Sequence, residues 1–145
     1  MTAFDIAPAF LETSAPLASL ALCEIRLQLD SRWPWIVLIP RRPGAREIAD
    51  LAAVDRASLM EEIVVAGEAV KAIGAALGSP VEKLNIGALG NITAQLHVHV
   101  VGRRADDPVW PGPVWGVGRA EAYAAKALER ASAAARSALA IKNAS

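Results

Sequence analysis

Alternating apolar and polar positions predict two neighbouring strands in the first third of the chain. In residues 23–29, Ile25 and Leu27 share one face while polar side chains share the other, as in a half-buried strand. Residues 35–39 form an unbroken apolar run, mostly aromatic and β-branched, which is typical of a strand covered on both faces. The short polar segment between them predicts a turn, so we expect the two strands to pair as a hairpin.

Apolar side chains spaced three and four residues apart predict a long central helix. Asp55 is suited to cap its N-terminus, and the pattern continues to Leu77, where a Gly-Ser-Pro sequence ends it. An alanine-rich segment at 119–140 predicts a second long helix, whose thin apolar stripe suits packing at the surface or against a partner. A short helix is expected at 8–13, because Pro8 suits a first helical position.

Two further strands are expected at 84–89 and 94–102, joined by a glycine-containing loop. The second of these strands contains both histidines of the chain. Because successive side chains of a strand point to opposite faces, its alternate apolar residues should face the core. Gln95, His97 and His99 would then line the other face together.

These elements together predict an α+β fold, with an antiparallel sheet of about five strands and the central helix packed on it. The additional helix would follow at the C-terminus. We expect a single domain over residues 1–145, with its core at 23–104 and a loop and helix at 105–145.

Composition and charge limit the functions to consider. Of the 145 residues, 54% are hydrophobic, and the 15 basic and 15 acidic side chains cancel. A chain without net charge is not expected to bind extended nucleic acid, and no apolar run is long enough to span a membrane. Cys23 is the only cysteine and the N-terminus lacks a secretion signal, so a reducing, cytoplasmic setting is expected. One cysteine and two histidines are also too few for a structural zinc site.

The histidine pair has three interpretations from the residues alone. The pair could simply be solvated, because a half-exposed strand carries polar residues on its outer face. It could bind a metal ion, although a third ligand would have to come from Cys23 or a carboxylate. Alternatively, one neutral imidazole attacks phosphorus while the other positions or protonates the leaving group. Gly90 and Asn91 would then offer backbone N–H groups to a phosphate, and Asn85 an amide donor.

The segment around the histidines resembles a known family. Its sequence is QLHVHVV, which is similar to the His-x-His-x-His-x-x signature (x apolar) of the histidine-triad superfamily of nucleotide hydrolases and transferases. Gln95 stands in place of the first histidine. The likeness continues through IVLIPRRP, the central helix and LNIGALGN, and covers residues 23–104 in the same order. The later WPGPVWG segment is similar to that of short bacterial members.

The resemblance implies a mechanism and a role for each residue of the motif. His97 matches the nucleophile, which attacks the α-phosphate of a nucleotide derivative and forms a covalent nucleotidyl-histidine that water then hydrolyses. The backbone carbonyl of Gln95 would hold Nδ1 of His97, so that Nε2 keeps its lone pair. His99 matches the histidine that contacts phosphate oxygens and the leaving group.

The resemblance also implies the contacts to the nucleotide. Asn85 and Asn91 match positions that lie beside the phosphate. Gly90, directly before Asn91, belongs to the same loop. Asp30 lies where the family binds the ribose hydroxyls, although an Asp there is equally typical of a turn. Ile92 replaces a Ser or Thr of the family, so one hydroxyl donor is missing.

The expected activity is therefore that of a nucleotide hydrolase or nucleotidyl transferase acting at an α-phosphate. Dinucleoside polyphosphates and nucleoside phosphoramidates are the expected substrates, and a homodimer is the expected assembly. No cofactor is required, although a divalent cation can accompany a polyphosphate. Trp35 replaces a histidine of many members, which removes a polar group. The alternatives are a nucleotide-binding homodimer without catalysis, and a metal-dependent enzyme that uses His97 and His99.

Overall fold

The computed structural model describes residues 3–144, which contain one five-stranded sheet. Its strands lie in the order β1-β2-β3-β5-β4, and every neighbouring pair is antiparallel. The predicted α+β fold with five antiparallel strands is therefore confirmed. In chain order the strands are β1 (Ser14–Ser19), β2 (Cys23–Gln28), β3 (Trp35–Pro40), β4 (Lys83–Gly87) and β5 (Val98–Arg103).

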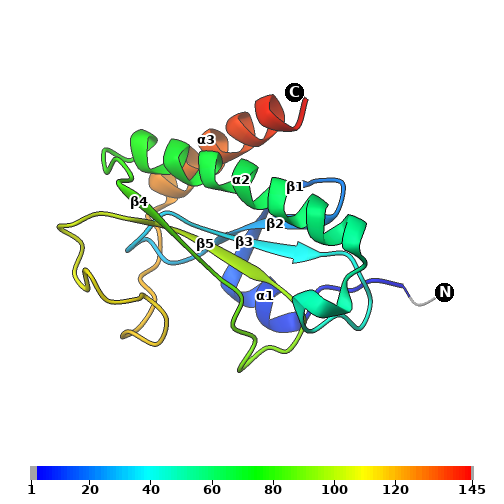
Figure 1. Cartoon of the computed structure of the whole chain (residues 1–145). Helices are drawn as coiled ribbons and strands as arrows, with labels where there is room; N and C mark the ends of the chain where they lie inside the picture. The colour runs from blue at the N-terminus through cyan, green and yellow to red at the C-terminus, as the bar shows by residue number, and fades with distance from the viewer. Residues whose placement is uncertain (1–2, 145) are drawn as a thin grey trace.

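Helices cover both faces of this sheet (Figure 1). The long helix α2 (Ala53–Ala76) lies across one face, and α3 (Ala125–Ala144) packs against α2 and β1. The short helix α1 (Pro8–Thr13) has the predicted bounds and lies on the opposite face of the sheet. One turn of 3-10 helix, η1 (Ile48–Asp50), precedes α2.

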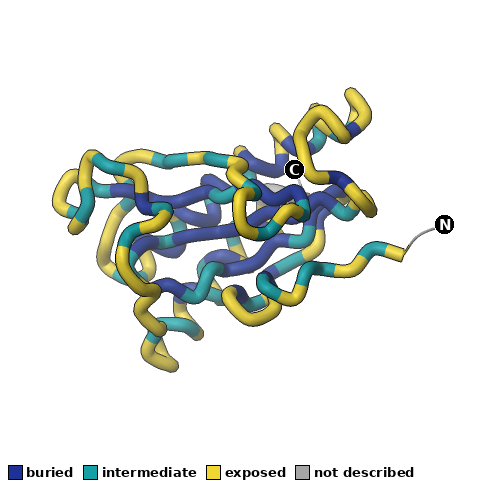
Figure 2. Tube along the Cα trace, turned by 90° about the horizontal axis from the view of Figure 1, so that it is seen from below, coloured by how far each residue is buried: buried dark blue, intermediate teal, exposed yellow. Residues whose placement is uncertain are grey.

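The side chains of β3 divide between two apolar clusters, because alternate residues of a strand point to opposite faces. Ile36 and Leu38 pack on the side of α2 and α3. Val37 and Ile39 pack on the other side, together with Phe10 of α1. All residues of β3 are buried, and Figure 2 shows the central strands as a buried layer between exposed loops. The prediction of a strand covered on both faces is confirmed.

Two strands differ from the predicted pattern. β1 is absent from the predicted elements because Pro16 interrupts its pattern. It forms at the sheet edge, where proline is tolerated, with an irregularity between Pro16 and Ala18. β5 begins at Val98 rather than at residue 94. The backbone N–H of Leu96 donates instead to the carbonyl of Ala45, outside the sheet, at 3.0 Å.

Two helix starts also differ from the prediction. The N-cap of α2 is an alanine, so Asp55 is not the cap; it lies in the first turn and pairs with Arg42 at 2.6 Å. A carboxylate in the first turn still interacts favourably with the helix dipole. α3 begins at Ala125, six residues later than predicted, because the preceding segment is bound to the β2–β3 turn. There, the N–H of Ser31 donates to the carbonyl of Glu121 at 2.8 Å.

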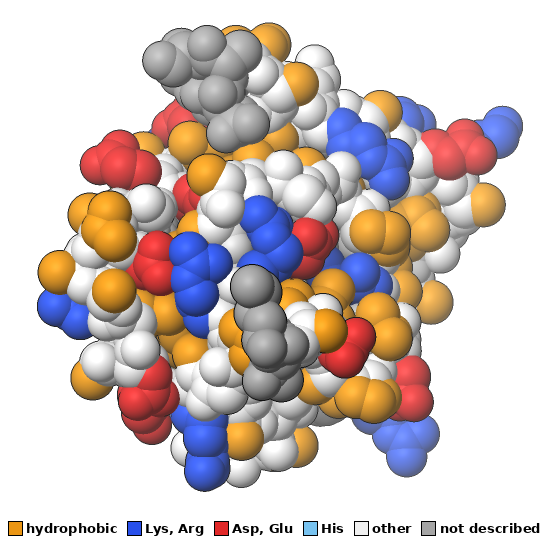
Figure 3. Space-filling view, turned by 90° about the vertical axis from the view of Figure 1, so that its right-hand side faces the viewer, with side chains coloured by type: hydrophobic (Ala, Val, Ile, Leu, Met, Phe, Trp, Pro, Cys, Tyr) orange, Lys and Arg blue, Asp and Glu red, His pale blue; other side chains and the backbone are white. Residues whose placement is uncertain are grey.

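Charged side chains of both signs are interspersed on the surface. Figure 3 shows basic and acidic groups beside one another on the face it presents, in keeping with the balanced composition. Exposed ion pairs such as Lys71 with Glu68 join neighbouring charges. None of the helices within residues 3–144 is long and apolar enough to cross a membrane.

Candidate functional site

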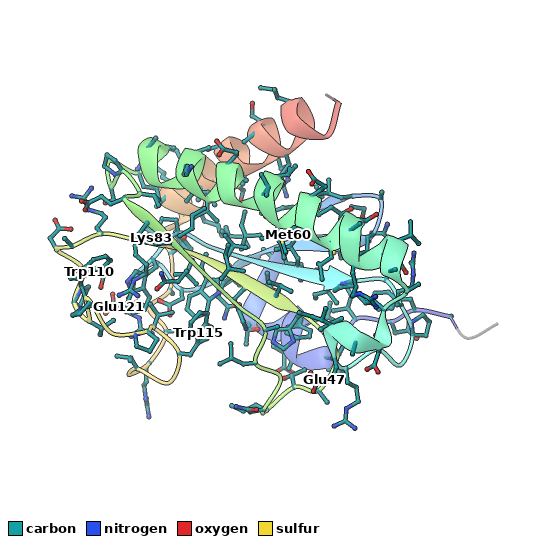
Figure 4. All side chains as sticks on the ribbon, in the orientation of Figure 1. Glu47, Met60, Lys83, Trp110, Trp115 and Glu121 are labelled. Atoms are coloured by element: carbon teal, nitrogen blue, oxygen red, sulfur yellow. The ribbon has the colours of Figure 1, made fainter. Side chains whose placement is uncertain are left out.

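A cavity of about 540 Å³ opens beside the two histidines, on the side of the sheet that carries α1. Its wall comes from α1, the loop before β5, the histidine segment and the C-terminal loop. Figure 4 shows Trp115 of that loop beneath the sheet, on the side away from α2. No Asp, Glu, Lys or Arg is among its lining residues within the described chain. The residues that line the cavity are Ala9, Phe10, Thr13, Gln28, Trp35, Leu89, Gly90, Asn91, Ile92, Thr93, His97, His99, Trp115 and Gly116.

His97 lines this cavity with one ring nitrogen already engaged. Its Nδ1 lies 2.7 Å from the backbone carbonyl oxygen of Gln95. Because a carbonyl oxygen can only accept, Nδ1 carries the proton and Nε2 keeps its lone pair. Burial lowers the pKa of His97 below its usual value, and the bond to Gln95 opposes this shift. The side chain is therefore a neutral imidazole at pH 7, as nucleophilic attack requires.

His99 is held in the opposite tautomer. The indole N–H of Trp35 donates to Nδ1 of His99 at 3.0 Å, so this nitrogen must be unprotonated and Nε2 must carry the hydrogen. Burial, with the neighbouring His97 as a second cause, lowers the pKa of His99 to about 4. The two imidazole rings lie edge to face, with centroids 4.9 Å apart. The pair thus offers one lone pair, on His97, and one N–H donor, on His99.

Trp35 therefore adds a polar contact where the sequence predicts the loss of one. Sequence comparison at one position considers only the missing histidine. The signal that could have found the contact is the register of the sheet, in which Trp35 pairs with Val101, diagonal to His99. An indole at that point reaches the imidazole across the strands.

The side chain of Gln95 does not line the cavity; it binds the N-terminal segment. Its Oε1 accepts the N–H of Ala7 and its Nε2 donates to the carbonyl of Asp5, both at 2.8 Å. Helix α1 begins directly after this segment. From α1, the ring of Phe10 contacts the ring of His97, with centroids 4.6 Å apart. Sequence reasoning missed Phe10, because nothing local in the sequence links α1 to the histidine strand.

The loop before β5 lines the cavity with Gly90, Asn91, Ile92 and Thr93. Gly90 has a φ of +71°, in the left-handed region that favours glycine. Ile92 is fully exposed at 100% relative accessibility, so its side chain has no packing role in the described chain. Thr93 brings a hydroxyl to the same wall, one residue after the hydroxyl that Ile92 lacks.

Asp30 and Asn85 are not brought into the wall of the cavity. Asp30 is 2% exposed, and its carboxylate pairs with Arg32 at 2.8 Å and accepts the N–H of Glu121 at 3.3 Å. Its pKa lies below the usual value, because these hydrogen bonds outweigh the largest single cause, burial, which raises it. Asn85 lies on β4, where its Oδ1 accepts from Arg103 at 2.8 Å. The nucleotide contacts expected of these two residues stay predictions.

The donor set of a metal site is incomplete around the histidines. Within residues 3–144, no group of three or more His, Cys, Asp or Glu side chains is placed to hold a metal ion. Cys23 belongs to the apolar cluster on the α2 side, where burial and Glu62 raise the pKa of its thiol. The described residues therefore do not supply the third ligand that the metal-dependent alternative needs.

Comparisons with known proteins agree on one family. The sequence pattern of the HIT domain family matches residues 13–106. A histidine triad protein from Bradyrhizobium japonicum is similar in structure, with a TM-score of 0.88 and 38% identity, over 95% of this chain and 99% of that one. A histidine triad (HIT) protein from Sinorhizobium meliloti 1021 has a TM-score of 0.83 and 40% identity, over 92% and 96%. No curated protein matches the sequence.

A third solved structure shows the same similarity at a lower sequence identity. The histidine triad protein from Marinobacter aquaeolei VT8 has a TM-score of 0.83 and 30% identity, and the match covers 97% of this chain and 98% of that one. The similarity thus spans the full fold, including the segments outside the matched family pattern.

Proposed function

The chain belongs to the HIT domain family, and from this premise we propose that it is a nucleotide hydrolase or nucleotidyl transferase acting at an α-phosphate. The observation that carries the proposal is the pair of opposite tautomers. His97 offers a lone pair on Nε2, and His99, 4.9 Å away between ring centroids, offers a hydrogen-bond donor. A nucleophile beside a donor for developing negative charge is the arrangement that phosphoryl transfer needs.

The reaction proceeds in two displacements. Nε2 of His97 attacks the α-phosphorus, a P–N bond forms, and the bond to the leaving group breaks with its electron pair on that group. The positive charge that develops on the ring is relieved through Nδ1, whose hydrogen bond to the Gln95 carbonyl strengthens. Water, or another acceptor in a transferase, then attacks phosphorus from the side opposite the imidazole and loses its proton to solvent, while the P–N bond breaks and the imidazole leaves neutral with its Nδ1 hydrogen.

The cavity suits a nucleoside monophosphate unit more than a chain of phosphates. Its volume of about 540 Å³ lies in the range of small-molecule sites, and its aromatic wall suits a base. Backbone N–H groups near Gly90 and the hydroxyl of Thr93 are available for phosphate oxygens. No Lys or Arg of the described chain lines this cavity, and a divalent cation bound with a polyphosphate substrate would supply the positive charge that this lining lacks. The covalent step itself requires no cofactor.

Trapping of the covalent intermediate tests this proposal. The protein is mixed with an AMP conjugate labelled in the phosphate and quenched in alkaline denaturant, because phosphorus–imidazole bonds hydrolyse in acid. We expect label on His97 within the first turnover, and none in His97→Ala. The His97→Ala protein should still bind AMP, which separates lost chemistry from lost binding. Turnover by His97→Ala at the wild-type rate would end the proposal.

A nucleotide-binding protein without catalysis is the second candidate. It is favoured by Ile92, because the loop before β5 thereby lacks the hydroxyl that the family resemblance implies at this position. This candidate predicts that AMP binds with an ordinary affinity while no label is ever trapped on His97. Calorimetry with AMP, combined with the trapping experiment, distinguishes the two.

The expected homodimer stays a prediction, with altered support. The thin apolar stripe of α3 is used within the chain, where Ala131, Ala135 and Leu139 are buried. Of the tryptophans, Trp110 is the most exposed, at 40%. Ile86, on the edge strand β4, is 51% exposed and is the better candidate for a contact with a second copy. Light scattering after size exclusion, on wild type and on Ile86→Lys, measures the assembly.

A further inference from the structure

The bond between Trp35 and His99 fixes more than the orientation of a ring. An indole N–H can donate a hydrogen bond but has no lone pair to accept one. Nδ1 of His99 lies 3.0 Å from it and is therefore an acceptor in the native state. Trp35 itself is only 7% exposed and is packed in the apolar cluster on the α1 side of the sheet, so the donor is held in place.

We propose that Trp35 is a positioning residue that makes His99 a hydrogen-bond donor and prevents it from acting as an acid, so that the site selects leaving groups that depart as weakly basic anions. The tautomer of His99 follows from its hydrogen bond to Trp35. The selection among leaving groups rests on the proposed function.

Proton balance at His99 connects the tautomer to the leaving group. To become an acid, His99 would need a second proton on Nδ1, which would set two donors against each other and break the bond to Trp35. A neutral imidazole that gave up its Nε2 hydrogen would become an imidazolate, which is far too basic. His99 thus keeps its hydrogen and only hydrogen-bonds to the departing atom. Phosphate, carboxylate and aryl oxide can leave in this way, whereas an amine must gain a proton as it leaves.

The surroundings of His99 contain little else that could protonate or stabilise it. His99 lies on β5. Its neighbours on β3 are Trp35, which it faces, and Val37, which lies opposite it in the register, and its partner on β4 is Gly87. Trp115 of the C-terminal loop packs at 5.8 Å between ring centroids. Among the described residues that face it, His97 is the one that titrates, and its charge would oppose that of His99. Burial and the Trp35 bond therefore act in the same direction.

Replacement of the indole by a phenyl ring tests the inference. Trp35→Phe keeps an aromatic ring in the cluster and removes the N–H donor. The matched control is Trp33→Phe, because Trp33 is also buried in this cluster and its Nε1 has no hydrogen-bond partner. Both variants remove an indole from the same core, but only the first removes the donor to His99.

Nitrogen NMR of the unliganded protein gives the first readout, and it needs no substrate. In wild type and Trp33→Phe we expect His99 as the Nε2–H tautomer, with protonation only in acid. In Trp35→Phe we expect a mixture of tautomers and a higher midpoint, because Nδ1 no longer faces a donor. An Nδ1–H tautomer in wild type, or an unchanged midpoint in Trp35→Phe, overturns the proposal. The wild-type spectrum alone tests the tautomer, whatever the stability of the variants.

Two AMP conjugates of equal charge give the second readout. One is the p-nitrophenyl ester, whose leaving group is a weakly basic anion, and the other is the adenosine 5′-phosphoramidate, whose nitrogen must be protonated to leave as ammonia. We expect the ratio of kcat/KM, ester over amidate, to fall on the order of tenfold in Trp35→Phe for each pH unit by which the His99 midpoint rises. An unchanged ratio together with a raised midpoint overturns the leaving-group part. If neither conjugate labels His97, the proposed function fails instead, and the NMR result still stands.

Discussion

The side chain of Gln95 binds the backbone of Ala7 across 88 positions of the chain, with 2.8 Å between Oε1 and the amide nitrogen. Its Nε2 donates to the carbonyl of Asp5 on the other side of the same amide group. The backbone carbonyl of this residue meanwhile orients His97. One residue thus holds the nucleophile through its main chain and, through its side chain, the segment that brings Phe10 against the nucleophile.

Gln95→Ala should loosen this wall without removing the bond that orients His97. Two hydrogen bonds are lost, so we expect the free energy of unfolding to fall by about 1–3 kcal/mol. The KM for an AMP conjugate should rise more than kcat falls, because Phe10 shapes the cavity while the carbonyl of residue 95 persists. Urea denaturation and steady-state kinetics measure the two effects.

A matched variant separates the two bonds of this amide. Gln95→Glu keeps an acceptor for the N–H of Ala7 but places an oxygen against the carbonyl of Asp5. It should therefore lose stability while keeping the size of the side chain. A Gln95→Ala protein with wild-type kcat/KM would show that the N-terminal segment has no influence on the site.

Much of the fold could be predicted because the core strands and α2 have strong patterns. The hairpin of β2 and β3 follows from alternation and from a run of buried residues, and both are local signals. β1 could not be found in this way, since Pro16 and small residues give it no pattern of its own. It exists because β2 has a free edge to which it can pair. The start of α3 likewise depends on a contact between distant segments, through Glu121.

The candidate site divides along the same line. The shared face of His97 and His99 follows from the period of a strand, and Gly90 and Asn91 follow from being adjacent in sequence. The family resemblance implies nucleotide contacts for Asp30 and Asn85, but each is engaged by an arginine that the sequence does not identify as its partner. Side-chain partners of this kind depend on tertiary contacts, which no local pattern encodes.

Asp30→Ala should destabilise the protein strongly. The carboxylate is buried and pairs with Arg32, whose Nη1 in turn donates to the carbonyl of Val117 at 2.7 Å. Removing this buried carboxylate deletes its charge-assisted hydrogen bonds to Arg32 and leaves the N–H of Glu121 without its acceptor, so we expect a loss of about 3 kcal/mol in the free energy of unfolding. Asp30→Asn, which keeps the size and one acceptor, should lose less. Equal stability of Asp30→Ala and wild type would contradict this structural role.

The ribose contact predicted for Asp30 is measured separately, on the wild-type protein. AMP and 2′,3′-dideoxy-AMP differ only in the ribose hydroxyls. If the carboxylate is fully occupied by Arg32 and the N–H of Glu121, the two should bind with the same affinity in calorimetry. A tenfold weaker dideoxy ligand would instead place a hydroxyl contact in the site.

Stability should fall as the pH drops from 7 towards 4. Both histidines have native pKa values below the ordinary 6.5, that of His99 at about 4, mainly because of burial. Below the ordinary pKa of 6.5, the unfolded chain binds more protons at these histidines than the native protein does. The stability that the two neutral histidines contribute is therefore fully present above about pH 6.5 and is lost progressively as the pH falls below it. The slope is at most about 1.4 kcal/mol per pH unit for each histidine. Urea denaturation at several pH values measures it.

The control for this pH dependence replaces both titrating rings. A His97→Asn/His99→Asn protein should show a flat stability between pH 7 and 5. Asp107 and Asp30 do not produce the effect there, because the pKa of Asp107 lies at about 2 and that of Asp30 below its usual value, so both stay ionised over this range. The same slope in the double variant would assign the pH dependence to other groups.

Ile92→Ser should strengthen phosphate binding at no cost in stability. Ile92 is fully exposed and lines the cavity, so its side chain contributes no core packing. We expect unfolding free energies within about 0.5 kcal/mol of wild type, as for exposed positions in general. A hydroxyl at this position adds one hydrogen-bond donor to the loop before β5. One hydrogen bond is worth about 0.5–1.5 kcal/mol, so the Kd for AMP should fall roughly two- to tenfold.

Ile92→Ala removes the same apolar group without adding a donor and should leave the AMP affinity near that of wild type. If the Ser and Ala variants bind AMP equally, the phosphate does not lie against this loop.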